Sequence, residues 1–396
     1  MSEWQKVNLG DCCEITSSKR IFFSEYVESG IPFYRSKEII EKGKGEEISH
    51  PLYISKEKYD EIKSKYGVPQ KGDLLLTAVG SLGIPFVVKD DSPFYFKDGN
   101  LVWLKHFQDI DPIFLYYWIK SENGYNALYN IAIGSAQKAL TIAAIKGYEI
   151  PLPPLQTQHR IASILSRYDS LIENYQKQIK LLEEAAQRLY KEWFVDLRFP
   201  GHENTKIVDG VPEGWEKKRL IDLVDVQYGY AFDGKLFNSS GEGMPILRIR
   251  NIPDGITSDY TTEEAQDCYI VHNGDIVVGM DGIFHINSWS GGDAYLVQRA
   301  CSFRPKEECM KGFIFQAIQE PIKFFEKTLV GATVAHLGKK HIDSIELCIP
   351  KNFELYKPFS KFYNQRQGLL SQIRLLTEAR DRLLPKLMSG EINVES

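Results

Sequence analysis

A few residue patterns in this chain have the chemistry of a catalytic centre, but none of them is complete. Glu61-Ile62-Lys63 has the Glu-x-Lys spacing of a nuclease site, yet such triplets are common by chance and a solvated helix face is the better explanation. The only Pro-Pro pair, Pro153-Pro154, lacks the preceding Asn or Asp and the following aromatic residue of an adenine methyltransferase motif. The chain also has no GxxxxGK[ST] loop for a nucleoside triphosphate. These gaps argue against a catalytic chain.

The histidines and cysteines are not arranged to hold a metal or to activate a nucleophile. None of the 8 histidines has an HxxxH partner, and His159 next to Arg160 fits a surface or interface position. The 6 cysteines, of which Cys12 and Cys13 are adjacent, form no CxxC pair. We expect reduced thiols, no metal site and a cytoplasmic location.

One segment does have the residue types that bind phosphates and base edges. In Gly134-Ser135-Ala136-Gln137-Lys138, the glycine allows close backbone approach to a phosphate and Ser135 can donate a hydrogen bond to it. Gln137 and Lys138 are long enough to reach a base. A similar segment, Gly331 to Leu337, has Thr333 and His336 in their place. Different side chains in matched segments are expected if two surfaces bind different bases.

Basic residues elsewhere form a second set of candidates. Arg35 and Lys37 align with Arg248 and Arg250, and arginine suits bidentate bonding to guanine. Structural alternatives remain open, because Gly80–Gly83 also fits a turn at a strand end and Arg35 can pair with a carboxylate. The candidate DNA-contacting residues are Arg35, Lys37, Ser81, Ser135, Gln137, Lys138, Arg248, Arg250, Thr333 and His336.

The elements that position these residues occur twice, because the chain repeats itself after about 200 residues. Five pairs of segments match in the same order, with drifting loop lengths between them. They are Trp4–Leu9 with Trp215–Leu220, Gly30–Arg35 with Gly243–Arg248, Lys71–Leu76 with Asn273–Val278, Gly134–Leu140 with Gly331–Leu337, and Ile145–Pro153 with Ile342–Pro350. One scaffold carrying two different surfaces is the simplest interpretation.

Each copy has a mixed pattern and predicts an α+β head of about 150 residues. A Gly-Asp turn followed by an apolar run predicts a buried strand after Asp73 and again after Asp275. Aromatic residues at helical spacing predict helices over Pro112–Glu122 and Gly312–Glu320.

A long helical pattern with alternating steps of four and three residues follows each head, which is the spacing of a coiled coil. The first seam is continuous, whereas Arg366 and Arg380 interrupt the second. The seam positions are Ile161, Leu165, Tyr168, Ile172, Tyr175, Ile179, Leu182, Ala186, Leu189 and Trp193, then Leu355, Phe359, Phe362, Arg366, Leu369, Ile373, Leu376, Arg380, Leu383 and Leu387. Helices packed on their own heads compete with a mutual coiled coil, which we favour.

Prolines mark the limits of these elements. Pro153 and Pro154 predict the end of the last strand and the start of the helix, and Pro385 predicts a kink or fraying in the last turn of the second helix. The predicted division is 1–153 and 201–350 for the two heads, with 154–200 and 351–396 for the two helices. An antiparallel pair of helices would relate the heads by an approximate two-fold axis, on a rod about 50–60 Å long.

The bulk composition gives no hint of this architecture. The chain of 396 residues has a net charge of −5 and a pI near 6.0, without the basic bias of many nucleic-acid-binding proteins. It has neither a secretory signal pattern at its start nor a run of apolar residues long enough to cross a membrane.

Taken together, these motifs resemble the specificity subunit of a type I restriction–modification system. The segments that carry the resemblance are IPLPPLQTQHRI (Ile150 to Ile161), LYKEWFVDLRFPGHE (Leu189 to Glu203), LLPKLMSGEI (Leu383 to Ile392), GSAQKALT and GATVAHL. The resemblance implies two target recognition domains that each bind one half of a bipartite, asymmetric DNA site, and no catalytic role for the chain itself.

The resemblance also implies partners. It implies two modification subunits that methylate adenine with S-adenosylmethionine, and motor-nuclease subunits that use ATP and Mg²⁺, so no cofactor is expected on this chain. Apolar residues beyond the needs of a spacer, Trp193, Phe194 and Phe199, are predicted to bind the modification subunits. The alternatives are a coiled-coil scaffold without DNA specificity and, less favoured, a self-contained modification or nuclease polypeptide.

Overall fold

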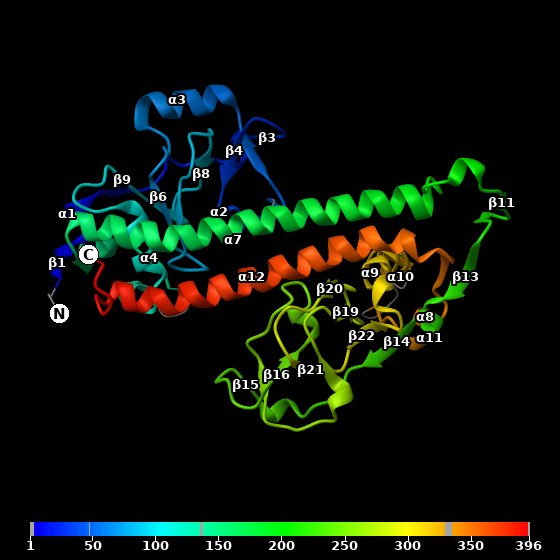
Figure 1. Ribbon diagram of the computed structural model, residues 1–396. Helices are drawn as coiled ribbons and strands as arrows, with labels where there is room; N and C mark the ends of the chain where they lie inside the picture. Colours follow the sequence, from blue (N-terminus) through cyan, green and yellow to red (C-terminus); the bar gives the residue numbers. More distant parts are fainter. Residues whose placement is uncertain (1–3, 47, 135–137, 329–334, 395–396) are drawn as a thin grey trace. The chain divides into compact units, whose positions relative to one another are not determined.

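The computed structural model describes residues 4–46, 48–134, 138–328 and 335–394 (Figure 1). It divides into two compact units, which we describe separately. Unit 1 comprises Met1–Glu173 with Leu376–Ser396, and unit 2 comprises Asn174–Leu375. Each of the two long helices therefore contributes one part to each unit. We call residues 4–152 head 1 and residues 215–350 head 2.

Head 1 has two small four-stranded sheets and a separate strand pair. The first sheet has the order β2-β9-β6-β7 and the second β3-β5-β4-β8, while β1 pairs with β10. The strands are β1 Gln5–Asn8, β2 Glu14–Thr16, β3 Tyr26–Val27, β4 Ile31–Tyr34, β5 Leu52–Ile54, β6 Leu74–Thr77, β7 Pro85–Val87, β8 Tyr95–Phe96, β9 Leu101–Lys105 and β10 Glu149–Leu152. The helices are α1 Leu9–Cys12, α2 Ser36–Lys44, α3 Lys56–Tyr66, α4 Pro112–Lys120, α5 Glu122–Ile131 and α6 Ile142–Lys146.

Head 2 repeats this plan. One sheet has the order β14-β22-β19-β20, the other β15-β17-β16-β21-β18, and β13 pairs with β23. The strands are β13 Trp215–Arg219, β14 Val224–Tyr228, β15 Phe237–Asn238, β16 Met244–Leu247, β17 Tyr260–Thr261, β18 Ile270–Val271, β19 Ile276–Gly279, β20 Ile286–Ser288, β21 Ala294–Leu296, β22 Ala300–Pro305 and β23 Glu346–Pro350. The helices are α8 Leu220–Leu223, α9 Lys311–Ala317, α10 Gln319–Thr328 and α11 Lys339–Asp343. The α+β fold with an internal repeat is confirmed.

The central strand of each head follows the Gly-Asp turn that the sequence predicts. Gly72 and Gly274 have positive φ angles of 93° and 85°, which glycine adopts without a steric penalty. The carboxylate of Asp73 accepts a hydrogen bond from the N–H of Gln70 at 2.9 Å, and Asp275 accepts one from the N–H of His272 at 3.0 Å. All residues of β6 and β19 are buried beyond these turns, as their apolar runs require.

Helix α7 spans Leu155–Tyr190, directly after the two prolines. The buried side chain of Gln158 closes this junction, because its amide nitrogen donates to the carbonyls of Pro153 at 2.8 Å and Asp109 at 3.0 Å. Its amide oxygen accepts from the N–H of Asp111 at 2.8 Å, one residue before α4. Gln158 therefore fastens the start of the long helix to head 1.

In unit 1, the first part of α7 packs against the last part of α12, which spans Lys357–Met388. Ile161 and Leu165 share a buried cluster with Leu387 and Met388. Further along α7, Asp169 lies 2.5 Å from Arg380. Later residues of α7 thus meet earlier residues of α12, and the two helices run antiparallel in this unit.

In unit 2, the remaining parts of the helices are also antiparallel. Glu183 lies 2.6 Å from Arg366, and the rings of Trp193 and Phe359 meet edge to face with centroids 6.1 Å apart. Leu182 and Leu369 are only partly buried. The predicted antiparallel pairing of the seams is confirmed within each unit.

Arg366 and Arg380, which interrupt the apolar seam, are polar links between elements. The guanidinium of Arg366 donates to Glu183 on α7 and, at 2.8 Å, to Asn287 of β20, and it also bonds Ser288. Arg380 pairs with Asp169, which accepts a hydrogen bond from the hydroxyl of Tyr117 on α4 at 2.7 Å. Burial, with the carboxylate beside it, raises the pKa of Tyr117, so the hydroxyl remains a donor. Each arginine joins both long helices to a head.

The fraying predicted at Pro385 is not seen, because helix α12 continues through this proline to Met388, and a kink there stays a prediction. One prediction about the residues that follow the first long helix is wrong. The aromatic residues Phe194 and Phe199 do not form an outward surface. Both are buried, with their rings 5.1 Å and 4.8 Å from that of Trp215, and the ring of Phe194 also lies 4.7 Å from that of Phe313, which is far away in sequence. Trp193 is half-buried.

Within the part of the chain that the structure describes, no helix combines the length and apolar character needed to span a bilayer.

Candidate nucleic-acid interface

Four segments of head 1 meet at one end of its two sheets. The carbonyl of Asn100, in the turn between β8 and β9, accepts from the N–H of Ala78 at 2.8 Å and from the hydroxyl of Ser36 at 3.2 Å. The carbonyl of Ala78 in turn accepts a hydrogen bond from the N–H of Leu140 at 2.9 Å. We call the described residues 35–37, 78–83, 97–100 and 138–140 loop face 1. Loops carried on a rigid scaffold are common binding surfaces.

Head 2 builds the same arrangement from matching segments. Met280 donates its N–H to the carbonyl of Arg299 at 2.8 Å and accepts from the N–H of Leu337 at 2.7 Å. Val297 donates to the carbonyl of Leu247 at 3.0 Å, just before the short 3-10 helix Ile249–Asn251. We call the described residues 248–250, 280–285, 297–299 and 335–337 loop face 2. The backbone framework of the two faces is shared, while their side chains differ.

On loop face 1, the basic candidates have intramolecular partners. The guanidinium of Arg35 pairs with the buried Glu38, and Lys37 lies 3.6 Å from Glu41. Burial alone would raise the pKa of Glu38, but hydrogen bonds from the Arg35 side chain and backbone outweigh it and hold that pKa below 4.5. Both cations are partly exposed, so these pairs orient them and leave an accessible edge. Their contact with DNA stays a prediction.

The other candidates of head 1 lie at the same face. Ser81 is exposed, and its carbonyl accepts the hydroxyl of Thr77. Lys138 donates to the carbonyl of Tyr129 at 3.2 Å and lies 3.6 Å above the centre of its ring. The structure therefore brings Ser81 and Lys138 to the loop face that also holds Arg35 and Lys37.

On loop face 2, each basic candidate is held by one neighbour. Arg248 lies over the ring of Phe237, 5.4 Å from its centre, and Arg250 makes a bidentate pair with Asp259 at 2.6 Å. The imidazole Nδ1 of His336 lies 2.6 Å from Asp281. Three further candidates, Ser135, Gln137 and Thr333, lie outside the described residues.

Two exposed arginines that the repeat does not indicate lie within loop face 2 or are paired with loop face 1. Arg20 precedes Phe22 in the loop after β2, and Arg299 lies in the turn after β21. Each is held by an aspartate, at 2.9 Å from Asp98 and 3.3 Å from Asp281. Arg20 and Arg299 come from different places in the two copies, so the repeat does not align them. In the sequence, these residues could have been suspected only because each is an arginine close to an expected turn.

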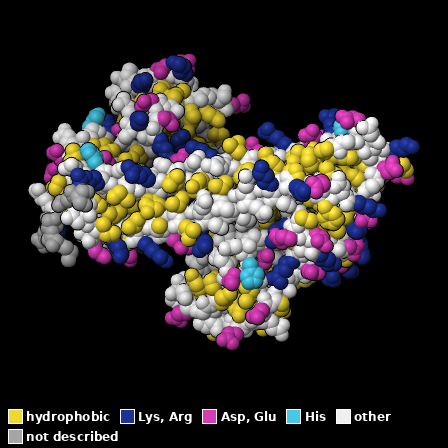
Figure 2. Space-filling view, in the orientation of Figure 1, with side chains coloured by type: hydrophobic (Ala, Val, Ile, Leu, Met, Phe, Trp, Pro, Cys, Tyr) yellow, Lys and Arg dark blue, Asp and Glu magenta, His cyan; other side chains and the backbone are white. Residues whose placement is uncertain are grey.

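The charge around these faces is mixed. Figure 2 shows acidic side chains interspersed with basic ones over the visible face, in keeping with the net charge of −5. The groups on these faces with the charge to bind a phosphate are therefore a few local cations.

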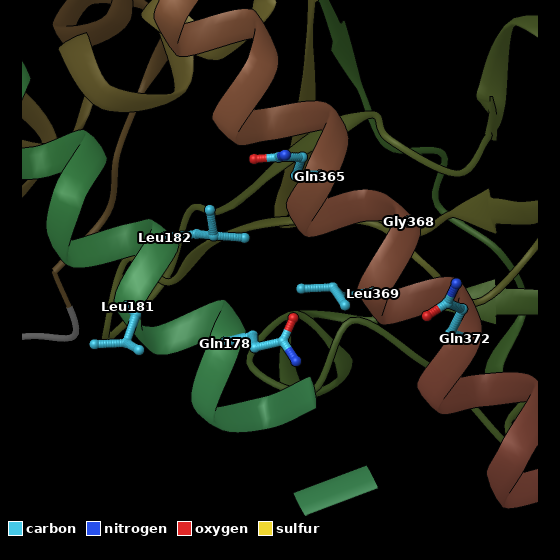
Figure 3. Close-up of a pocket in the computed structure, with 7 residues that line it drawn as sticks. All are labelled: Gln178, Leu181, Leu182, Gln365, Gly368, Leu369 and Gln372. Carbon is cyan, nitrogen blue, oxygen red and sulfur yellow. The ribbon is translucent and has the colours of Figure 1, made fainter. Parts of the chain in front are cut away.

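A separate apolar groove opens between the two long helices in unit 2 (Figure 3). It encloses about 470 Å³, and Leu181, with 65% of its surface exposed, lies at its edge. Gly368 lines the groove, and a Cβ added there would meet nothing within 4 Å. The lining residues are Gln178, Leu181 and Leu182 of α7 with Gln365, Gly368, Leu369 and Gln372 of α12.

Comparison with known proteins decides which family this architecture represents. The profile of the type I restriction modification DNA specificity domain matches residues 1–184 and 212–374, most of both copies. The chain belongs to this family. It acts in DNA sequence recognition as a specificity subunit, a role without catalysis. Its partners are DNA and other subunits of a type I restriction–modification system.

Individual relatives agree with this assignment. The MjaIX specificity subunit of Methanocaldococcus jannaschii is 28% identical over 362 residues, which cover 82% of this chain and 78% of the relative. The MjaVIII specificity subunit of the same organism is 26% identical over 422 residues and covers 100% of this chain and 94% of its own. The type I system S subunit from M. genitalium shares the fold, with a TM-score of 0.59 at 18% identity over 97% of this chain and 96% of that one.

Proposed function

We propose that each head binds one half of a bipartite, asymmetric DNA site through its loop face, and that the two long helices set the spacing between the halves. The observation that carries this proposal is the pair of loop faces, which share backbone hydrogen bonds at Asn100 and Arg299 but differ in side chains. A shared scaffold with different base-facing groups is what recognition of two unlike sequences requires.

The candidate contacts remain Arg35, Lys37, Ser81 and Lys138 in head 1 and Arg248, Arg250 and His336 in head 2, together with Ser135, Gln137 and Thr333. Long, positively charged or hydroxyl side chains serve both phosphates and base edges. S-adenosylmethionine, ATP and Mg²⁺ belong to the partner subunits in this proposal.

Methylome sequencing tests this function. A host expressing this chain with its cognate modification subunit should show adenine methylation at a motif of two short blocks around a fixed gap. The motif should vanish when this chain is removed. Methylation without any motif that depends on this chain would favour the scaffold alternative.

The apolar groove supports the docking of a modification subunit on the helix pair. Its leucines lie beside glutamine amides, a combination that fits an amphipathic helix. In this proposal two modification subunits bind the chain, and motor-nuclease subunits join them.

Filling the groove tests the docking. Gly368→Trp should block assembly with the modification subunit in size-exclusion chromatography, because the indole occupies the groove. Lys361→Trp, at an exposed position of the same helix, is the matched control and should assemble normally. Normal assembly of Gly368→Trp would place the docking surface elsewhere.

A further inference from the structure

Both heads hold an exposed arginine against a sheltered aspartate at the loop face. In head 1, Nε of Arg20 donates to Asp98 at 2.9 Å, with the two side chains 69% and 20% exposed. In head 2, Nε of Arg299 lies 3.3 Å from Asp281, with 68% and 22% exposed. The two pairs match closely in exposure and in the guanidinium atom used, although they come from different positions in the repeat.

The turn between the two small sheets positions both pairs. Asp98 belongs to the turn that ends at Asn100, whose carbonyl joins α2 to the loop after β6. In head 2 the corresponding carbonyl belongs to Arg299 itself, and it accepts the N–H of Met280. Arg299 therefore lies within loop face 2, and Arg20 is paired with Asp98 of loop face 1.

The backbone of Arg299 indicates that its side chain has a use. Its φ of 71° is a left-handed conformation, which costs a residue with a Cβ about 1 kcal/mol. The corresponding turn of head 1 has glycine at such an angle, Gly99 with φ of 73°. Strain of this kind clusters at functional sites. A glycine would satisfy the backbone of the head 2 turn as well, so the turn itself does not require an arginine.

The chemistry of the pair favours guanine. When Nε faces a carboxylate, the two terminal nitrogens remain for another partner, and they form the fork that bonds O6 and N7 of guanine. An aspartate that holds the guanidinium in advance reduces the side-chain entropy lost on binding. Both aspartates are mostly shielded from water, which strengthens their hold on the arginine.

We infer that Arg20 and Arg299 are guanine-reading residues of the two heads, oriented by Asp98 and Asp281. This inference rests on the function proposed above. Asp281 is also 2.6 Å from Nδ1 of His336, so one carboxylate orders two cation-capable side chains on loop face 2. Asp98 and Asp281 are positioning residues, because they act through the arginines.

Competitive binding by the assembled complex tests the inference. The complex of the full-length chain and the modification subunit is titrated with a duplex that contains the motif found by methylome sequencing. It is also titrated with duplexes in which one G·C pair of the motif at a time is replaced by A·T. Arg299→Gln should lower discrimination at a guanine of one block by about tenfold or more, and Arg20→Gln should do so only in the other block. Asp281→Asn should weaken the same discrimination as Arg299→Gln, by a smaller factor.

Two further variants separate recognition from folding. Arg299→Gly suits the left-handed backbone, so it should keep the thermal midpoint of the parent chain while losing the discrimination. Arg219→Gln is the matched control, because Arg219 is also exposed and paired with an aspartate, Asp222, but lies at the end of β13. It should bind every duplex like the parent.

Specific outcomes would overturn the inference. One is that Arg299→Gln and Arg20→Gln discriminate at every guanine as well as the parent does. Another is that they lose affinity equally for all duplexes, which would indicate phosphate contact. Blocks without guanine would also contradict it. In each of these cases the chain-dependent motif still stands, whereas the absence of any such motif would overturn the proposed function together with the inference.

Discussion

At the scale of single residues, ion pairs within the heads orient the basic side chains of the loop faces. Arg35 is the clearest case, because its guanidinium and backbone N–H both bond the buried Glu38 at the start of α2. The lowered pKa of Glu38 means that its charged form is stabilised by folding. This contribution is fully present above the ordinary pKa of 4.5 and is lost as the pH falls below it.

Glu38→Gln should therefore destabilise the chain by about 1 kcal/mol at pH 7, and the difference should shrink at pH 4. Urea denaturation at both pH values measures it. Glu28→Gln, at an exposed position of the same head, is the control and should have little effect. A difference of equal size at pH 7 and pH 4 would show that the charge of Glu38 is not responsible.

Arg366 makes a second prediction at this scale. Its side chain is only 10% exposed, and it links Glu183, Asn287 and Ser288. Arg366→Met keeps most of the volume but leaves three polar groups without this donor, so unfolding of unit 2 should become easier by about 2 kcal/mol. Hydrogen exchange on peptides from residues 174–375 measures the change.

Two companion variants identify the cause. Lys361→Met, at an exposed position of α12, should be neutral. Adding Glu183→Met to Arg366→Met should restore part of the loss, because an apolar pair then replaces the ionic one. If the double variant is less stable than Arg366→Met, the ion pair is not the source of the effect.

At the scale of elements, a close contact between α9 and α12 fixes one end of unit 2. A Cβ added at Gly312 would lie 2.2 Å from the carbonyl oxygen of Phe359, whereas one added at Gly368 would meet nothing within 4 Å. Gly312→Ala should cost about 2 kcal/mol, because the backbone must move apart. Gly368→Ala should instead stabilise by about 0.5–1 kcal/mol through helix propensity. Chemical denaturation compares the two, and a neutral Gly312→Ala would contradict the packing described.

The elements were largely predictable from sequence, while their polar connections were not. The apolar runs after Asp73 and Asp275 predicted buried strands, and the seam from Ile161 to Trp193 predicted a long helix, since both patterns are local. The sequence shows Arg366 and Arg380 only as interruptions of the apolar seam. A heptad pattern does not reveal that each pairs with a carboxylate on the other long helix. Phe194 and Phe199 were placed outward for the same reason, since their partners come from head 2.

The candidate site was predictable only in part. The segments that match between the two copies do belong to the loop faces, and Ser81, Lys138 and His336 lie on these faces. Arg20 and Arg299 were missed, because an arginine held by Asp98 or Asp281 is recognised only when φ angles and distances are known. The sequence alone gives neither the φ angles nor the distances.

At the scale of the whole molecule, the two heads are structurally independent. Each has its own sheets, its own core and its own loop face, and the same backbone framework supports both faces. In the proposed function, independent heads make the two halves of the DNA site separately exchangeable, while the helices set the gap between them.

The measurement that tests this most directly is methylome sequencing after residues 1–150 are exchanged for those of another specificity subunit, with the cognate modification subunit present. We expect one block of the methylated motif to change, while the other block and the gap stay the same. A change in both blocks, or in neither, would contradict it.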